Sequence, residues 1–481
     1  MGKHSLRNQP HHLLLVTVSI LMGSGRVAPD APAIALVEAG TAQFIIVHAE
    51  RSARVGEAIY AFDQPKTSDV LAGLLAEYIG RVSGAEVRVF AETAAPAEYP
   101  GIVLHLGATA RGAAFAETRG EMEEDEFFIA FPDPTTILIT GSFQHGIEWG
   151  TYEFIERFLG VRWLFAGELG THIPKAPYIT VAPQEVNQKP AYLTRAISFD
   201  NDRSELSDWS RLSRLRRRVR HGHYLGVLVH PDTFFETHPE FYPVQGGARA
   251  RPIDPLTFVA WQPCFTAPGI AQTIAPHVAQ FIRASTPPTS TISLGVNDNG
   301  GHCECARCLA LDGDGKTPSG LANRSESYYT FCNALAAEGH RHLPDRHELR
   351  FGLLAYSQVS VPPRTSLHPS LVPFITLDRM LWADPETRRL GHALNEQWQR
   401  QAHAIGWYDY IYGKHYSLPR VYFHTMQEYL SYGSRNDVEH YYAEAYIADD
   451  YREGPKYWLT MKLLWNPELD VETALDEWYA A

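Results

Sequence analysis

The stretch that decides the fold is Ser290–Asn299, STISLGVNDN, an apolar run that ends abruptly in the polar pair Asn297 and Asp298. A short uncharged run of this kind is typical of a strand buried on both faces of a parallel sheet. Asn and Asp favour the turn that follows a strand. Polar residues at the C-terminal ends of parallel barrel strands also build active sites. The stretch therefore predicts both a buried strand and a candidate site residue.

Similar runs recur along the second part of the chain, separated by segments that leave room for helices. They cover residues 192–200, 223–231, 258–265, 349–357, 372–378, 404–413 and 438–446, and the run at 258–265 is the weakest of them. Eight strands alternating with helices over nearly 300 residues fit a (β/α)8 barrel. The sequence therefore predicts an α/β protein with a TIM-like barrel over residues 190–481.

The preceding part has a different pattern, which predicts a small α+β domain over residues 36–185. Strand-like runs lie at 43–49 and 101–107, and two strand-like runs separated by a polar turn predict a hairpin over 126–141. The amphipathic stretches 67–84 and 145–160 predict helices that end at glycine. The polar, proline-containing stretch 182–191 predicts a linker to the barrel.

The first 35 residues resemble an export signal. Lys3 and Arg7 precede the apolar run 13–23, and Ala33-Ile-Ala35 offers a cleavage site. The apolar run is too short to cross a bilayer, and no other segment is a candidate membrane span. These features predict a periplasmic or extracellular protein, and the alternative is a disordered leader behind a wrongly chosen start codon.

Composition narrows the class of ligand. The net charge of the 481 residues is −13, which argues against a general nucleic-acid binder. The chain has 10 Trp, 24 Tyr and 22 Phe, and such rings offer the flat apolar surfaces on which sugars stack. The arginine-rich stretch 210–223, SRLSRLRRRVRHGH, is either the solvated face of a helix or an attractor of an anionic ligand such as a uronate or sulfated sugar.

Polar residues at or near the ends of the predicted barrel strands supply the candidate site. These are Asp200, His230, Asn297, Asp298, Tyr356, Asp378, Asp409 and Glu444. Glycoside hydrolysis needs two carboxyl groups, one to protonate the leaving oxygen and one to act as base or nucleophile. The predicted catalytic residues are Asp298, Asp409 and Glu444, and the predicted substrate contacts are His230, Tyr356, Asp378, Trp407 and Tyr410. Each can also be an ordinary turn or core residue, and Arg379 beside Asp378 suggests a salt bridge.

Four of the five cysteines are candidates for a metal site. Cys303, Cys305 and Cys308 have C-x-C-x-x-C spacing, and Cys264 lies near the end of the third predicted strand, next to the loop that carries them. Thiolates at this spacing bind zinc, so these four cysteines are a candidate structural zinc site. A disulfide and free thiols are the alternatives. Catalysis by two carboxylates requires no cofactor.

Three motifs give a resemblance to a known family. Residues 146–175, the NDNGGHCECARC stretch at 297–308, and KLLWNPELDVETALDEWY at 462–479 resemble the DUF4838 family. The resemblance implies an N-terminal domain like that of α-glucuronidases and hexosaminidases, placed before a glycosidase-like barrel. It also implies that Asp298, Asp409 and Glu444 occupy matching positions, although Ala445 stands where a glycine is expected after Glu444. Family members usually continue beyond the last residue of this chain.

These observations lead to three hypotheses. The first is an exported glycoside hydrolase acting on a polysaccharide or oligosaccharide, with or without acidic sugars. The second is a non-catalytic carbohydrate-binding protein built on a barrel. The third is a metal-dependent hydrolase that uses the cysteine cluster and therefore needs an open coordination position. All three expect neither nucleic acid nor an integral membrane segment, and the oligomeric state does not follow from the sequence.

Overall fold

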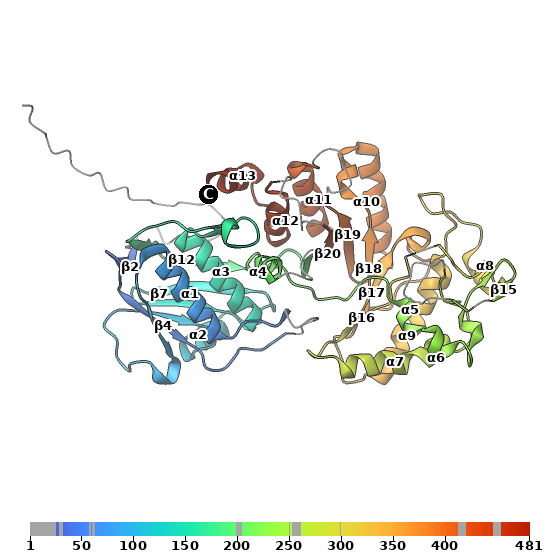
Figure 1. Cartoon of the computed structure of the whole chain (residues 1–481), viewed down its shortest axis with the longest axis horizontal. Helices are drawn as coiled ribbons and strands as arrows, with labels where there is room; N and C mark the ends of the chain where they lie inside the picture. The colour runs from blue at the N-terminus through green and yellow to red at the C-terminus, as the bar shows by residue number, and fades with distance from the viewer. Residues whose placement is uncertain are drawn as a thin grey trace, which may run out of the picture.

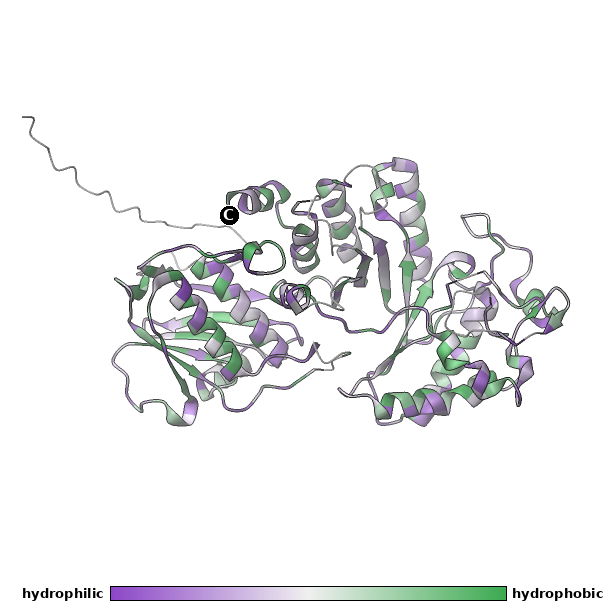
Figure 2. Cartoon of the chain, in the orientation of Figure 1, coloured by the Kyte–Doolittle hydropathy of each residue, from purple (hydrophilic) through white to green (hydrophobic). Residues whose placement is uncertain are grey.

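The computed structural model describes residues 26–27, 32–56, 59, 63–198, 204–249, 251–252, 261–298, 300–411, 420–445 and 454–481. The two largest sheets, one from each half of the chain, lie side by side and are flanked by helices (Figure 1). Along the helices, hydrophilic and hydrophobic residues alternate around the surface (Figure 2), as expected for helices packed on one side. No helix of the described part has the length and apolar character to span a bilayer.

The N-terminal half forms a seven-stranded mixed sheet. Its order is β1 (Arg26–Val27), β12 (Gln184–Gln188), β7 (Phe127–Asp133), β8 (Thr136–Thr140), β6 (Ile102–Leu106), β4 (Phe44–His48) and β5 (Arg88–Ala91). The strands β5, β4, β6 and β8 run parallel, and β7 pairs antiparallel with β8 as the predicted hairpin. The helices are α1 (Ser68–Ser83), α2 (Ala110–Glu117) and α3 (Gln144–Leu159). A smaller sheet joins β11 (Ile179–Val181), β2 (Ile34–Glu38) and β3 (Thr41–Ala42).

Both predicted helix ends are confirmed. Gly84 and Gly160 follow α1 and α3 with φ of 78° and 73°, a left-handed conformation that glycine adopts without a steric penalty. The linker predicted at 182–191 is wrong, because this stretch contains β12, which pairs with β7. The prediction failed because four of the five residues of β12 are polar, and only Val186 is buried.

Most of the predicted leader lies outside the described residues. Two of its described residues, Ile34 and Ala35, are paired with β11 in β2. A cleavage directly after Ala35 would therefore remove the start of a strand that belongs to the folded sheet.

The second half contains six parallel strands that curl into a half-barrel. Their order is β13 (Thr194–Ile197), β20 (Val438–Glu444), β19 (Ile405–Tyr410), β18 (Leu371–Thr376), β17 (Arg350–Ala355) and β16 (Thr291–Ser293). The longer helices here are α4 (Ser204–Leu212), α7 (Ile270–Ala284), α9 (Ser325–His342), α10 (Pro385–Gln399), α11 (Phe423–Arg435), α12 (Lys456–Trp465) and α13 (Val471–Ala480). The prediction of parallel strands alternating with helices is confirmed for these six runs.

The prediction of eight barrel strands is wrong in the described part of the chain. The run at 223–231 contains a short helix, α5 (Leu225–Leu228), and the third run has no strand in its described residues 261–265. The segment 214–224 instead crosses the gap between β13 and β16. Arg216 forms an isolated bridge with Arg195 of β13, and His223 forms one with Gly295 just beyond β16.

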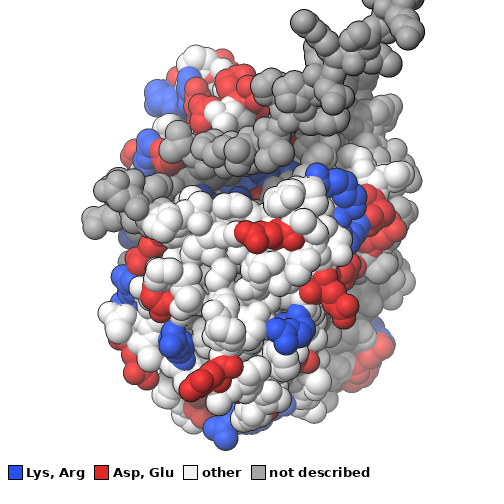
Figure 3. Space-filling model, turned by 90° about the vertical axis from the view of Figure 1, so that its left-hand side faces the viewer, with Lys and Arg blue, Asp and Glu red and all other residues white. Residues whose placement is uncertain are grey.

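The arginine-rich stretch joins the two halves of the molecule. Arg211 pairs with Glu148 of α3, and Arg214 pairs with Glu153 and Glu156 of the same helix. Arg211 and Arg214 are buried, so these two arginines form neither a solvated helix face nor a binding surface for an anionic ligand. Figure 3 shows the end of the N-terminal half that faces away from this interface. Its positive and negative side chains are scattered among uncharged residues.

Glu153 makes this interface sensitive to acid. Burial raises the pKa of Glu153, but attraction by Arg214 and Arg157 outweighs burial and lowers the pKa to about 2. A depressed carboxyl pKa stabilises the fold above the pKa of the unfolded chain, and this stability is lost as the pH falls towards the folded pKa. The relevant window is therefore roughly pH 4.5 to pH 2.

We expect Glu153→Gln to lower the free energy of unfolding at pH 7 by on the order of 3 kcal/mol, since one pKa unit corresponds to about 1.4 kcal/mol. Urea denaturation at several pH values measures this. The difference between wild type and variant should shrink between pH 4.5 and pH 2. A difference that stays constant over that window would show that the Glu153 charge does not stabilise the fold.

Candidate functional site

The candidate site lies where the half-barrel strands end. Asp298 follows β16, Tyr356 follows β17, and Glu444 is the last residue of β20. The Tyr356 hydroxyl donates a hydrogen bond to Asp298 Oδ1 at 3.0 Å. The Asp298 side chain is 39% exposed, so its remaining oxygen positions are accessible to a ligand. Burial, the charge of Asp298 and its hydrogen bond, and then the charge of Glu444 raise the pKa of Tyr356 to about 12.

Tyrosines also surround Glu444. The Tyr408 hydroxyl donates a short hydrogen bond to Glu444 Oε1, and Tyr410 lies opposite Glu444 in the register of β19 and β20. Burial, together with the neighbouring Tyr442 and Glu444, raises the pKa of Tyr408, so this hydroxyl stays protonated and donates at neutral pH. The structure thus brings Asp298, Tyr356 and Glu444 to one end of the sheet, with Tyr408 and Tyr410 beside them.

The alternation of side chains along β19 separates Asp409 from this group. The ring of His221, in the segment 214–224, lies 4.2 Å from that of Phe374 and 4.5 Å from that of Tyr442, so these residues face the inner side of the sheet. Glu444 lies two residues after Tyr442 and therefore shares that side. Asp409 precedes Tyr410 by one residue and points to the opposite, helix-covered side.

Asp409 is buried and hydrogen-bonded on the side of the sheet opposite to Glu444, a position that argues against the predicted catalytic role. Its side chain is 1% exposed and accepts hydrogen bonds from the backbone N–H groups of Arg379 and Tyr410 and from the Tyr441 hydroxyl. These donors satisfy a buried carboxylate and leave it no contact with solvent.

Trp407 lies on the same helix-covered side, a position that argues against the predicted contact with substrate. The indole is 1% exposed, donates to Asn395 Oδ1 at 3.0 Å, and stacks under the Arg379 guanidinium at 4.0 Å. It packs edge-to-face against Trp382 of η7 (Arg379–Ala383). Trp407 therefore packs between β19 and the helices that cover it.

Asp378 forms a salt bridge, although not with the neighbouring Arg379. Both its oxygens accept from Arg420 Nη2 at 2.7 Å. Burial raises the pKa of Asp378, and the contact with Arg420 opposes that increase. A carboxylate engaged in this way is better suited to holding the loop after β18 than to acid–base chemistry.

His230 lies away from the end of any described strand, at the start of the helix α6 (Pro231–Phe234), where its ring accepts from the Asp232 N–H. The histidine that the structure places at the site is His223, whose Nε2 is 3.8 Å from Asp298 Oδ1. Sequence reasoning missed it because the apolar residues 224–229 were assigned to a strand, which moved the predicted strand end by seven residues. Asp200, the remaining strand-end candidate, lies outside the described residues.

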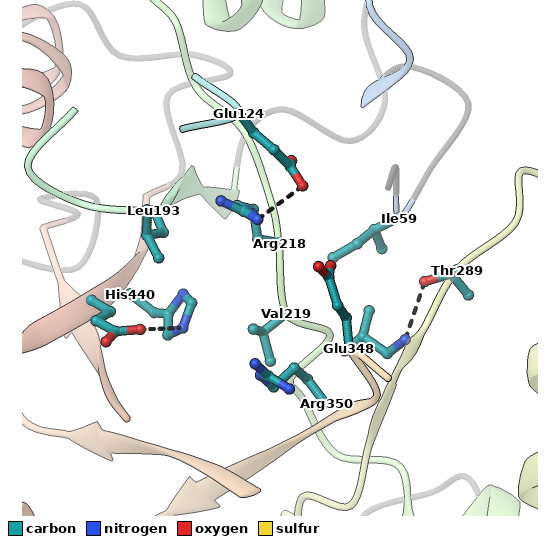
Figure 4. A pocket seen from close by; sticks show the side chains of 11 residues that line it. Ile59, Glu124, Leu193, Arg218, Val219, Thr289, Glu348, Arg350 and His440 are labelled. Atoms are coloured by element: carbon teal, nitrogen blue, oxygen red, sulfur yellow. Dashed lines mark hydrogen bonds and ion pairs between the residues drawn. The ribbon is translucent and has the colours of Figure 1, made fainter. Parts of the chain in front are cut away.

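A hollow lies at the N-terminal end of the strands (Figure 4). It has a volume of about 110 Å³ and is lined by residues near the starts of the strands, such as Thr291, Arg350 and His440, together with Arg218 of the segment 214–224. In barrels, this N-terminal end serves stability and the C-terminal end carries the chemistry. We therefore place the candidate site at Asp298 and Glu444 and not in this cavity.

The four predicted metal ligands converge at one point. Cys264, Cys303, Cys305 and Cys308 place their sulfur atoms within 4.8 Å of one another. Cys264 Sγ lies 3.7 Å from Cys305 Sγ and 3.9 Å from Cys308 Sγ, and no disulfide joins them. Cys332 lies apart in α9 and is buried.

Comparison with solved structures gives the class of fold. The chain resembles a family GH115 4-O-methyl-α-glucuronidase with specificity for decorated arabinogalactans, with a TM-score of 0.53 and 11% identity over 92% of this chain. The chain spans 59% of that enzyme's length. Weaker likenesses include a family 89 glycoside hydrolase from Clostridium perfringens (TM-score 0.48, 9% identity, 86% and 50% of the two chains). Another is a β-N-acetylhexosaminidase from Bacteroides fragilis (TM-score 0.46, 10% identity, 95% and 92%).

The chain therefore has an α/β fold with a curled parallel half-barrel, similar to the fold of the GH115 enzyme. A family model for DUF4838, a domain of unknown function, matches residues 165–481, and the chain belongs to that family. No curated protein matches the chain.

Proposed function

We propose that this protein is an exported glycoside hydrolase that cleaves a polysaccharide or oligosaccharide with Glu444 and Asp298 as its two carboxyl groups. One carboxyl protonates the leaving oxygen, and the other attacks the anomeric carbon or activates water. Tyr356 and Tyr410 contact the substrate, and His223 replaces His230 among the expected contacts.

The observation that carries this proposal is the position of Tyr356. Its hydroxyl is bonded to Asp298, and the charge of Glu444 acts on it as well. Asp298, which accepts from Tyr356, and Glu444, which accepts from Tyr408, thus both lie at the end of the strands where barrel enzymes carry out their chemistry. The fold comparison supports the same class of reaction and does not select a sugar.

The structure removes the argument for an acidic substrate that rested on the arginine-rich stretch. Its guanidinium groups at Arg211, Arg214 and Arg216 are ion-paired inside the protein. The proposal therefore assigns no charge to the substrate. The metal-dependent alternative is not supported either, because four sulfur ligands fill a tetrahedral site and leave no open position for a substrate.

A hydrolysis screen over a library of neutral and acidic glycans tests the proposal. We expect release of reducing sugar from at least one glycan by wild-type protein and not by the double variant Asp298→Asn/Glu444→Gln. Binding of a glycan with equal affinity by both proteins, without turnover by either, would instead favour a non-catalytic carbohydrate-binding protein.

A further inference from the structure

We propose that Cys264, Cys303, Cys305 and Cys308 bind one zinc ion in a closed structural site that fastens the loop carrying Asp298. The inference does not depend on the proposed hydrolase activity. It rests on the arrangement of the four sulfur atoms and on the hydrogen bonds that surround them.

The spacing of the sulfurs fits tetrahedral zinc. A zinc–sulfur bond of about 2.3 Å in a regular tetrahedron separates neighbouring sulfurs by about 3.8 Å. The distances from Cys264 Sγ to Cys305 Sγ and Cys308 Sγ are 3.7 Å and 3.9 Å. A disulfide needs about 2.05 Å between its sulfurs, and the present spacing is far from that.

The surroundings donate hydrogen bonds to the sulfurs. The Val244 N–H points at Cys303 Sγ with a distance of 3.2 Å, and Thr266 Oγ1 lies 3.1 Å from Cys308 Sγ. Such donors stabilise thiolates and orient them towards a metal, as outer contacts do in known zinc sites. Cys264, Cys303 and Cys308 are also buried, which excludes water from three of the four ligands.

The site ties together segments that are far apart in the sequence. Cys264 comes from the stretch before α7, and the other three cysteines come from the start of α8 (Ala306–Asp312) and the residues before it. The Glu304 N–H also donates to the Val244 carbonyl at 2.8 Å, which adds a third segment. A metal ion bound by the four cysteines would therefore connect these segments directly.

The cysteine cluster is also connected to Asp298, through hydrogen bonds of the adjacent residue Asn297. Asn297 is bonded to Gln262 twice, through its N–H and its carbonyl oxygen, and its side chain donates to the Trp261 carbonyl. The Gln262 N–H donates to the Gly301 carbonyl at 2.8 Å. The segment 261–264 thus holds the loop on both sides of Asp298, and Cys264 and Cys303 lie at the two adjacent ends that the zinc would join.

Metal analysis of untagged wild-type protein tests the inference first. We expect about one zinc per chain by mass spectrometry of the metal content. Replacement by cobalt should give the intense visible bands of tetrahedral cobalt bound by thiolates. Iron as the bound metal, a disulfide among the four cysteines, or protein that neither contains nor takes up zinc would overturn the proposal.

Two serine variants then test the ligands and the tether. Cys305→Ser/Cys308→Ser should lose the zinc and lower the melting temperature, whereas the control Cys332→Ser, which removes a buried thiol outside the cluster, should keep one zinc. Hydrogen exchange in residues 294–302 should become faster when wild-type zinc is removed by a chelator, and exchange in β4 and β6 should not change. Unchanged exchange in 294–302 after complete zinc loss would contradict the tether.

Discussion

Glu444→Gln is expected to lower kcat for glycan hydrolysis by about 10²–10⁴-fold, because that is the usual contribution of a general acid or base. Glutamine keeps the shape of the side chain and can still accept from Tyr408, whose hydroxyl bonds Glu444 Oε1. The folded structure and the KM should therefore change little. A steady-state assay on the glycan found by the screen measures the effect.

A matched control lies on the same strand. Glu439 is at the opposite end of β20 and lines the cavity at the strand starts, so Glu439→Gln should retain activity within about twofold of wild type. Equal activity of Glu444→Gln and wild type would remove Glu444 from the proposed mechanism. Loss of activity in both variants would point to a folding defect, which circular dichroism and melting curves would reveal.

The roles of the two carboxyls can be separated with small anions. If one of them is a nucleophile, its alanine variant, Asp298→Ala or Glu444→Ala, should regain activity with added azide or formate, which takes the vacated position. The acid–base variant should instead lose one limb of the pH–rate profile. The anomeric configuration of the first-formed product of the wild-type enzyme, read by NMR, decides between retention and inversion.

Asp125→Asn is expected to have the largest effect on stability, with a loss of about 3–5 kcal/mol in the free energy of unfolding. Asp125 is 2% exposed and accepts from Arg216, Arg195 and the Trp149 indole. Burial alone would raise the pKa of Asp125, but attraction by Arg216 and Arg195 holds it well below its usual range. The neutral side chain would leave both guanidinium groups buried beside one fewer negative charge.

Urea denaturation of wild type and variant at pH 7 measures this loss. The control is Glu386→Gln, which breaks the exposed pair of Glu386 with Arg389 on α10 and should leave the free energy of unfolding unchanged within error. A similar small effect for Asp125→Asn would mean that water or another acid, such as Glu124, compensates for the lost charge.

The sequence predicts much of the half-barrel because buried parallel strands are short apolar runs, and six of the eight predicted runs are strands. It failed at 223–231, where an apolar run of strand length forms α5 (Leu225–Leu228), and periodicity alone does not separate the two cases. The arginine-rich stretch misled for a different reason. Composition shows how many charges a segment carries, but not that α3 supplies their partners from 58 residues or more away.

Alternation along the strands predicts which site residues share a side of the sheet, but not which side faces the interior of the half-barrel. Alternation along β19 and β20 places Glu444 with Tyr442, and Asp409 with Trp407, on opposite sides of the sheet. This signal was present in the sequence once the strands were assigned. Which side faces inward depends on contacts such as that of His221 with Phe374, which join residues far apart in the chain.

The ion pairs of α3 bear on how this protein can evolve. The DUF4838 match begins at residue 165, whereas Glu148, Glu153 and Glu156 precede it. Their partners Arg211 and Arg214 lie inside the matched region. A rearrangement that moved only the matched region would transfer buried cations without their counter-ions, so we expect residues 165–481 to be less stable without α3 than with it.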